Sequence, residues 1–378
     1  HGSAVSVSAP RCLPAAQGAA GYCGVDLSTG RHAVEKPGID PAEHTPLCDV
    51  VPGSEVSLRQ LLKHRLLQFS LGQKLLEAGV LLLQLGEPLG FLGLHPAVRR
   101  AAEECGAAGT VTSASALANG PDQDALRPSY PGISLGAHLN IVRGAPLSPA
   151  REVRSLVGEN GMFLGSFSAL AARALRGGIV RSEVRLEWSR QVAHLRARGL
   201  ALSHLDSEQH AHHLPGLFGV ACDVAREHGI AWVRRSDERF GGLRLGIPAL
   251  RRAVLRLLAA RAQTGPAVGT VDAVWGIADQ GARCTADACA QALRGRGFTR
   301  HGGSARGAPR VVEIVCHPGR ALPQDPAIPP SFGRMRVRDL WEPEYRGFSG
   351  DAWRAAAVAN KWRLTSFDRL RPIPSDDR

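Results

Sequence analysis

The sequence has no long apolar run, few aromatic residues and no closely paired cysteines, and each absence narrows the class of protein. The longest apolar stretch near the start, residues 78–83, is far too short to span a bilayer, so we expect no membrane span. None of the 8 cysteines forms a CxxC pair, which excludes a zinc ribbon and a thioredoxin motif. Scattered cysteines are typical of buried, reduced thiols, and they predict a cytoplasmic protein.

Positive charge, by contrast, is abundant: the net charge is +12 and the pI is about 10.0. Such a balance is one signature of nucleic-acid binding. However, the chain has no dense basic block and only 3 tyrosines, and its arginines are scattered over expected helix faces, as at Arg99 and Arg100. We therefore interpret the arginines as a solvated surface and expect no nucleic acid among the partners.

From about residue 94 onward the hydrophobic pattern alternates between strands and helices. Helices are predicted over residues 95–105, 180–198, 215–228, 248–262 and 286–294. Strands are predicted over residues 111–118, 134–142, 201–212, 230–234, 271–277, 310–317 and 362–367, and a separate leucine-rich helix over 56–85. This order predicts an α/β fold of mostly parallel strands with outer helices, arranged as a distorted (β/α) barrel. Chemistry in such barrels lies where the strands end.

Residues 204–215 carry the densest group of ionisable side chains in the chain. In an extended segment alternate side chains share one face, which would then carry His204, Asp206, Glu208, His210 and His212. Burying so many polar groups costs free energy unless they are paired or bound to a metal. The alternative is an exposed edge strand or a solvated histidine-rich loop, which the apolar flanks of the segment disfavour.

Two further strands carry a polar residue of interest on one face. His138 lies within the strand predicted over residues 134–142, where a lone histidine is either a ligand or a satisfied core residue. Glu313 and His317 share a face of the strand over 310–317, and His317 precedes a Pro-Gly turn. A histidine at that end of a strand is placed for proton transfer, and the alternative is a cap or a packed histidine.

Taken together, three separate strands bring histidine or carboxylate groups near their C-terminal ends. Nitrogen and oxygen ligands without thiolates suit Zn²⁺ or another divalent ion that keeps an open position for water. Such an ion lowers the pKa of bound water and polarises a carbonyl group. The arrangement therefore predicts hydrolysis of an amide or an ester.

The same segments resemble the YdjC-like carbohydrate deacetylases, the family that includes chitooligosaccharide deacetylase and a hopanoid-biosynthesis-associated branch. The resemblance runs from about residue 93 to residue 370 and rests on short motifs that keep their order. These motifs are Gly-Leu-His-Pro-Ala-Val at 93–98, Val-Thr-Ser-Ala-Ser at 111–115, Asn-Gly-Pro at 119–121, Gly-Ala-His-Leu at 136–139, Gly-Ala-Pro-Leu-Ser at 144–148, the segment 204–215, Glu-Ile-Val-Cys-His-Pro-Gly at 313–319 and Leu-Thr-Ser-Phe at 364–367.

The resemblance implies a distorted α/β barrel that removes acetyl groups from N-acetylated sugars with the help of a divalent metal ion, Mg or Zn. The family holds its metal through three side chains. They are an aspartate of an Asp-Asp-Phe-Gly motif, the histidine of Gly-x-His-Leu, and the histidine two residues after the aspartate of His-Leu-Asp-x-His. On that match His138 is a metal ligand and Glu208 stands in the third ligand's place, which shifts the preference towards harder metals. His210 is the nearest alternative nitrogen ligand.

The remaining candidate residues complete the expected site. His317 resembles the active-site histidine of the family and is a candidate acid for the leaving amine, and we assign Asp206 to catalysis with it. His212 and Glu313 are expected to bind the substrate. The expected partner is an N-acetylated carbohydrate, and a homodimer is compatible with the sequence.

One departure from the family pattern lies directly before Gly93. Residues 88–93 read Pro-Leu-Gly-Phe-Leu-Gly, so the aspartate pair, and with it one metal ligand and the usual general base, is missing. A shifted reading frame or a wrong exon would explain this, as would a true loss of activity. We therefore expect residues 1–92 to be an atypical N-terminal segment, either poorly ordered or wrongly predicted from the gene, followed by a deacetylase domain over 93–370 and a tail over 371–378.

Three functions follow in order of support. The first is a metal-dependent hydrolase that removes acetyl groups from N-acetylated amino sugars or oligosaccharides and is impaired by the loss of the Asp-Asp motif. The second is a catalytically inactive relative that still binds a carbohydrate or a metal. The third is a basic nucleic-acid-binding protein, which only the net charge supports.

Overall fold

The computed structural model describes residues 91–238, 247–262, 268–294, 311–332 and 340–370. All of them belong to one compact unit, which comprises residues 58–378. The leucine-rich helix expected over 56–85 lies outside the described residues, as do residues 1–90 and the tail over 371–378. The division of the chain at residues 92 and 370 therefore stays a prediction.

The described strands are all parallel and form two sheets. The larger sheet has the order β1 (Ser113–Leu117), β2 (Ser134–Leu139), β3 (Leu202–Ser207) and β4 (Trp232–Val233). The smaller sheet pairs β5 (Ala273–Trp275) with β6 (Val312–Ile314). Single bridges extend the larger sheet at both edges, from Leu92 to Ala116 beside β1 and from Trp232 to Gly269 beside β4.

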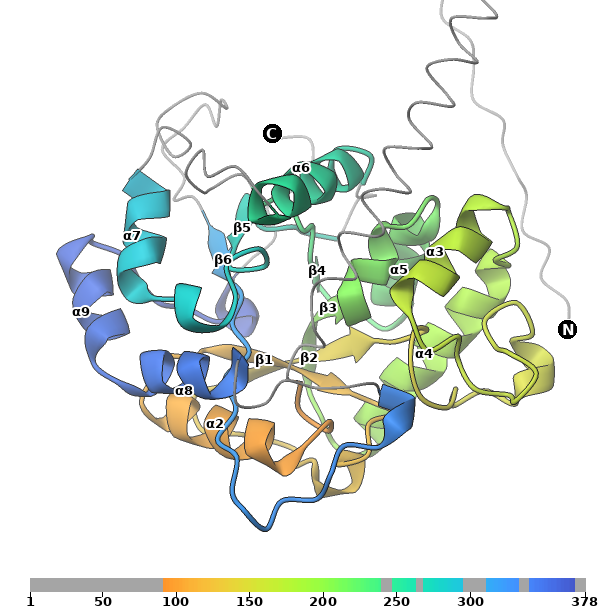
Figure 1. Cartoon of the computed structure of the whole chain (residues 1–378), viewed down its shortest axis with the longest axis horizontal. Coiled ribbons are helices and arrows are strands. Elements are labelled where there is room, and N and C mark those ends of the chain that lie inside the picture. Colours follow the sequence, from red (N-terminus) through yellow and green to blue (C-terminus); the bar gives the residue numbers. More distant parts are fainter. Residues whose placement is uncertain (1–90, 239–246, 263–267, 295–310, 333–339, 371–378) are drawn as a thin grey trace, which may run out of the picture. The chain divides into compact units, whose positions relative to one another are not determined.

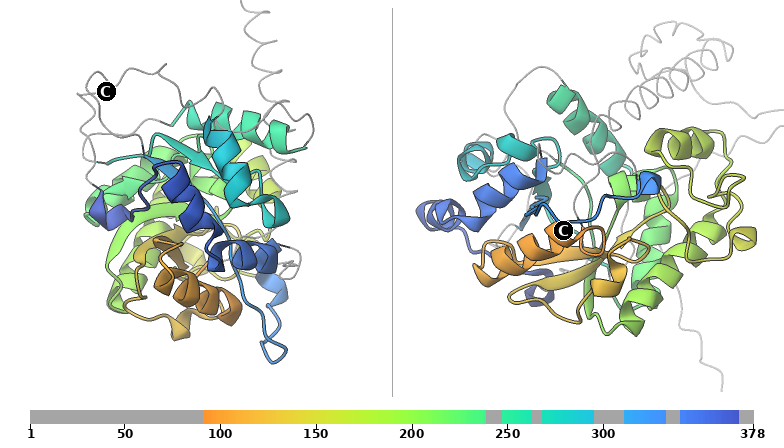
Figure 2. Two further views of the ribbon diagram at one scale, coloured as in Figure 1. Left: turned by 90° about the vertical axis from the view of Figure 1, so that its left-hand side faces the viewer. Right: turned by 60° about the horizontal axis from the view of Figure 1, so that its bottom comes forward.

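Helices surround these strands (Figures 1 and 2). They are α2 (Pro96–Ala107), α3 (Phe167–Leu175), α4 (Arg181–Ala197), α5 (Leu217–Glu227), α6 (Ile247–Ala259), α7 (Ala286–Arg294), α8 (Glu342–Ser349) and α9 (Ala352–Ala359). The structure confirms the predicted α/β fold of parallel strands with outer helices. Among the described strands the barrel is interrupted, because the two sheets are not joined by a continuous ladder.

Local sequence explains where the helices begin and which face they bury. Pro96 occupies the first turn of α2, where its missing N–H costs nothing, and the His95 ring accepts a hydrogen bond from the backbone of Ala97 at 3.1 Å. In α4 the stripe that includes Val184 and Trp188 is fully buried, because apolar residues at helical spacing share one face.

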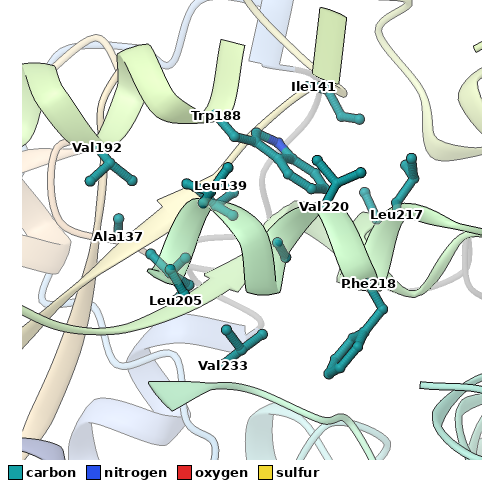
Figure 3. Close-up of a cluster of buried hydrophobic side chains, with 14 of the residues drawn as sticks. Ala137, Leu139, Ile141, Trp188, Val192, Leu205, Leu217, Phe218, Val220 and Val233 are labelled. Carbon is teal, nitrogen blue, oxygen red and sulfur yellow. The ribbon is translucent and has the colours of Figure 1, made fainter. Parts of the chain in front are cut away.

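The main hydrophobic core lies between the larger sheet and helices α4 and α5 (Figure 3). Leu139 of β2, Leu205 of β3 and Val233 of β4 pack there with Trp188 of α4. All six residues of β2 are nevertheless buried, so the opposite face of this strand is also covered. That inner face carries Gly136 and His138.

The strand expected over residues 362–367 is wrong. This segment has no strand pairing in the structure and leads into a short 3-10 helix, Phe367–Arg369. Side-chain hydrogen bonds hold it beside the start of β1: the Thr112 hydroxyl donates to the Thr365 carbonyl at 2.5 Å, and the Phe367 amide donates to Ser113 Oγ at 3.3 Å. The apolar pattern of this segment resembles that of a paired strand. However, the segment contacts β1 through side chains and not through a backbone ladder.

The sequence predicted reduced cysteines and no membrane-spanning segment. Within the described ranges no disulfide joins the cysteines, which are Cys105, Cys222, Cys284, Cys289 and Cys316, and all but Cys316 are buried. None of the helices within the described ranges combines the length and the apolar character needed to cross a membrane. The cytoplasmic location stays a prediction.

Candidate active site

His138 of β2 lies at the centre of a buried polar cluster. Its strand neighbour in register is Asp206 of β3, and the two residues face the same side of the sheet. His138 Nδ1 donates to Asp206 Oδ1 at 2.8 Å, and His138 Nε2 lies 3.3 Å from Glu208 Oε2. Burial lowers the pKa of His138, but the charge of Asp206 and the hydrogen bonds to both carboxylates outweigh it and raise the pKa above its ordinary value.

Arg234 pairs with two carboxylates on the other side of this cluster. It follows β4 directly and donates to Asp206 Oδ2 from Nη1 and to Glu313 Oε1 from Nε, the latter at 2.9 Å. Burial raises the pKa of Asp206, yet the charges of Arg234 and His138 hold it well below its usual range. Both oxygens of Asp206 are thus occupied within the protein. This arrangement places Asp206 between His138 and Arg234, and the catalytic assignment of Asp206 stays a prediction.

Glu208 has a cation on one side and the imidazole of His138 on the other. Arg143, in the loop after β2, places Nε 3.5 Å from Glu208 Oε1, and both side chains are at most 10% exposed. Burial raises the pKa of Glu208, while the hydrogen bond from His138 and the charge of Arg143 lower it more strongly. Glu208 is therefore an ionised, internally paired carboxylate.

The stripe of alternating ionisable residues expected over residues 204–212 is correct at its start and wrong after Ser207. His204 and Asp206 share the inner face of β3, but a 3-10 turn, Glu208–His213, follows at once. Gln209 and His210 adopt left-handed backbone angles, with φ of 49° and 58°. The Ser207 hydroxyl accepts from the His212 amide at 3.0 Å and so closes the turn.

The histidines of this turn are held within the protein. His212 Nε2 donates to the Arg234 carbonyl at 2.8 Å, and its Nδ1 contacts Ser207 Oγ, so both ring nitrogens have partners within the protein. The expected role of His212 in substrate binding stays a prediction. His210 Nδ1 lies 3.0 Å from Ser236 Oγ. Burial, first of all, lowers the pKa of His212 to about 4, which keeps the ring neutral at pH 7.

The His317 ring differs from the rings of the turn histidines because it has no hydrogen-bond partner among the described residues. It is 2% exposed, and neither ring nitrogen makes a hydrogen bond, although Nδ1 lies 3.7 Å from a carboxylate oxygen of Glu344. Its strand is shorter than expected, because β6 ends at Ile314, and His317 lies in the segment beyond it. Burial and then the charges of Arg234 and His138 lower its pKa to about 3, so the imidazole is neutral.

Phe91 lies in the place where the family resemblance implies an aspartate. Leu92 pairs with β1: its amide donates to the Ser115 carbonyl at 3.2 Å, and its carbonyl accepts from Leu117 at 2.8 Å. The chain therefore occupies the position of a first strand next to β1. The Phe91 ring stacks on the His138 imidazole and meets His317 edge-on, with ring centroids 3.2 Å and 6.1 Å away. The sequence departs from the family pattern at this position, and the structure places the aromatic ring of Phe91 where the family has an aspartate.

The described donors do not fit a retained metal ion. Within the described part of the chain, no group of three or more histidine, cysteine, aspartate and glutamate side chains is arranged to hold one. His138 Nε2 and Glu208 are the only two of the expected ligands that face each other, and Glu208 already has Arg143 as its counter-ion. A catalytic zinc site normally takes three protein ligands. The assignment of His138, Glu208 and His210 as metal ligands stays a prediction, and the proposed chemistry does not depend on it.

The fold and the site define a class: a parallel α/β protein with a buried cluster of histidine, carboxylate and guanidinium groups at the ends of its strands. The profile of the YdjC-like protein family matches residues 92–357, and the chain belongs to this family. The carbohydrate deacetylase of Homo sapiens is 33% identical over 282 residues, which cover 70% of this chain and 83% of that protein. The carbohydrate deacetylase of Mus musculus is 32% identical over 288 residues, 70% and 87% of the two chains.

A solved structure also shares the fold. It comes from Enterococcus faecalis V583 and is assigned to cellobiose-phosphate cleavage. Its TM-score is 0.51 at 23% identity, and the match covers 73% of this chain and 94% of the other. At this identity the likeness concerns the fold alone.

Sequence reasoning missed the two arginines of the site. Arg234 is the last residue of the strand predicted over residues 230–234, so a cation at the end of an apolar strand was the available signal. Arg143 lies in a loop, and no periodic pattern indicates where its guanidinium points. The structure assigns both arginines to the site through their ion pairs with Asp206, Glu208 and Glu313.

Proposed function

We propose that this chain is a carbohydrate deacetylase that acts on N-acetylated amino sugars or oligosaccharides, and that its hydrolytic step is impaired. Membership of the family and the two curated deacetylases support the reaction. The observation that carries the impairment is Phe91, which stacks on His138 and supplies no oxygen at that place. Hydrolysis of an amide needs a base for the attacking water. The paired carboxylates of the site are not free to act as one, which leaves the weakly basic imidazole of His317 among the described residues.

His317 is the residue that we propose for proton transfer. Its ring is buried, neutral and without a hydrogen bond in the protein, so its nitrogens are available to a bound substrate and its water. A neutral imidazole first accepts a proton from the attacking water and then passes it to the leaving amine. Arg234 and Asp206 hold the neighbouring His138, and Glu313, whose Oε2 has no hydrogen bond, is the remaining candidate for contact with sugar hydroxyl groups.

Replacement of residues 1–93 by a strand that ends in Asp-Asp-Phe-Gly tests this proposal. We expect the chimera to release acetate from N-acetylated chitooligosaccharides about 10²–10⁴ times faster than the unmodified chain, because it regains a base. A chimera that carries the same strand with both aspartates changed to asparagine is the matched control. Equal rates for the unmodified chain and the chimera would show that the missing motif was not needed.

A second function, an inactive relative that binds carbohydrate, is favoured by one observation. Each carboxylate of the cluster already contacts a guanidinium or an imidazole, which suits binding better than proton abstraction. Calorimetric titration with N-acetylated chitooligosaccharides separates the two: binding without acetate release favours the inactive relative. The expected homodimer stays a prediction that sedimentation analysis would check.

A further inference from the structure

Arg143 is held in place at both its backbone and its side chain. The Asn140 side chain accepts from the amides of Val142 and Arg143 at 2.8 and 3.2 Å, and it donates to the Arg143 carbonyl at 2.8 Å. At the other end, Arg143 Nη1 donates to the Phe332 carbonyl at 2.7 Å. The residue is 8% exposed, so its guanidinium is a fixed, largely dehydrated cation.

This cation faces the carboxylate that the resemblance places in a metal ligand's position. Arg143 Nε lies 3.5 Å from Glu208 Oε1, while the other Glu208 oxygen lies 3.3 Å from His138 Nε2. Asp206 next to it has its own guanidinium, that of Arg234. Each carboxylate around His138 is therefore neutralised by an arginine of the same chain.

A divalent ion would have to take Glu208 from Arg143. The arginine would then remain buried without a counter-ion beside a second positive charge, which is strongly unfavourable. Phe91 adds carbon and no donor atom on the face of His138, so none of the described residues supplies a third ligand that offsets that cost. Both the charge of Arg143 and the number of donor atoms around His138 therefore disfavour a bound divalent ion.

We propose that the guanidinium of Arg143 takes the place of a divalent cation in this site, so that the chain keeps no resident metal at His138. This inference concerns occupancy of the site and holds whether or not the chain removes acetyl groups. It also gives Glu208 a role, since a histidine at this position would leave Arg143 without a partner.

Metal content of the full-length protein tests the proposal. The chain is incubated with Zn²⁺ or Mn²⁺, dialysed and measured by elemental analysis, and calorimetric titration with each ion gives the affinity. We expect wild type and Arg143→Lys, which keeps the charge, to retain far less than one ion per chain. Arg143→Met should gain affinity for the ion by about 10-fold or more, because Glu208 loses its counter-ion.

The controls make each result decisive. Arg185→Met removes an exposed ion pair with Glu227 and should leave metal content unchanged. If Arg143→Met does not fold, Arg143→Gln keeps a donor for the Phe332 carbonyl and serves in its place. His138→Ala in the Arg143→Met background should abolish the gained binding, which places the ion at this site.

Two outcomes overturn the proposal. One is a wild-type protein that keeps about one ion per chain, lost in His138→Ala. The other is a lack of any gain in Arg143→Met and Arg143→Gln, which removes the guanidinium as the cause. Acetate release by a metal-free wild type would contradict the proposed impairment of hydrolysis but would not contradict the proposal for Arg143. The two proposals can therefore be refuted independently.

Discussion

The Phe91 ring lies nearly parallel to the His138 imidazole, with an interplanar angle of 20°. The pair joins the first described residue of the chain to the middle of β2. Phe91 has no donor atom that could accept a proton or coordinate a metal ion, so the site lacks both functions at this position. The Phe91 ring also covers the histidine around which the carboxylates and arginines of the site are arranged.

His317 and His212 should respond differently to replacement, although both are buried. We expect His317→Ala to lower kcat by about 10²–10⁴ in the chimera that releases acetate, with a small change in Tm, because its ring holds no hydrogen bond. His212→Ala should lower Tm clearly, since it removes hydrogen bonds to Ser207 and Arg234. Steady-state kinetics and thermal melts measure both. A His317 variant that unfolds, or one that keeps the full rate, would contradict the catalytic assignment.

Arg234 should contribute more to stability than any exposed arginine. Arg234→Met leaves Asp206 and Glu313 buried without their partner, and we expect a loss of about 3–5 kcal/mol in the free energy of unfolding. The matched control, Arg185→Met, removes a pair whose arginine side chain is 54% exposed, and it should cost less than about 1 kcal/mol. Urea denaturation measures both. Equal losses of unfolding free energy in the two variants would mean that the buried ion pairs of Arg234 stabilise the protein no more than an exposed pair does.

Glu344 should make stability depend on pH. Burial raises the pKa of Glu344 to about 7, although the amides of Gly281 and His317 donate to it. Between the ordinary value of 4.5 and about 7 the folded state keeps a proton that the unfolded state has lost. Stability from this group therefore falls as the pH rises through that window. The stability of wild type relative to Glu344→Gln should decrease from the acidic to the neutral end, and a constant difference in urea denaturation would refute this.

Gly136 should tolerate no side chain. A Cβ at this position would lie 2.4 Å from His204 Nε2, inside the sheet, so Gly136→Ala should cost about 1–3 kcal/mol through overpacking. Gly219 is exposed in α5, and a Cβ added there would meet no atom within 4 Å, so Gly219→Ala should stabilise by about 0.5–1 kcal/mol. Thermal and urea unfolding of the two variants give the comparison. A stable Gly136→Ala protein would mean that His204 moves freely.

The order of elements and half of the site could be predicted from the sequence. Alternation with a period of two placed His138 and Asp206 on the inner face of neighbouring strands, and the structure pairs them in register. The lack of a carboxylate before Gly93 was equally visible, because it depends on residue identity alone. Helices such as α4 followed from their apolar stripes.

Tertiary structure alone decided the rest. β3 ends at Ser207 because a hydroxyl closes the turn and two residues adopt left-handed angles, which side-chain periodicity does not record. The expected strand over 362–367 failed because its partners are side chains of β1 and the residues before it. Arg143 and Arg234 reach Glu208, Asp206 and Glu313 only when distant strands meet, since the position of a long, flexible side chain depends on the charges that packing brings to it.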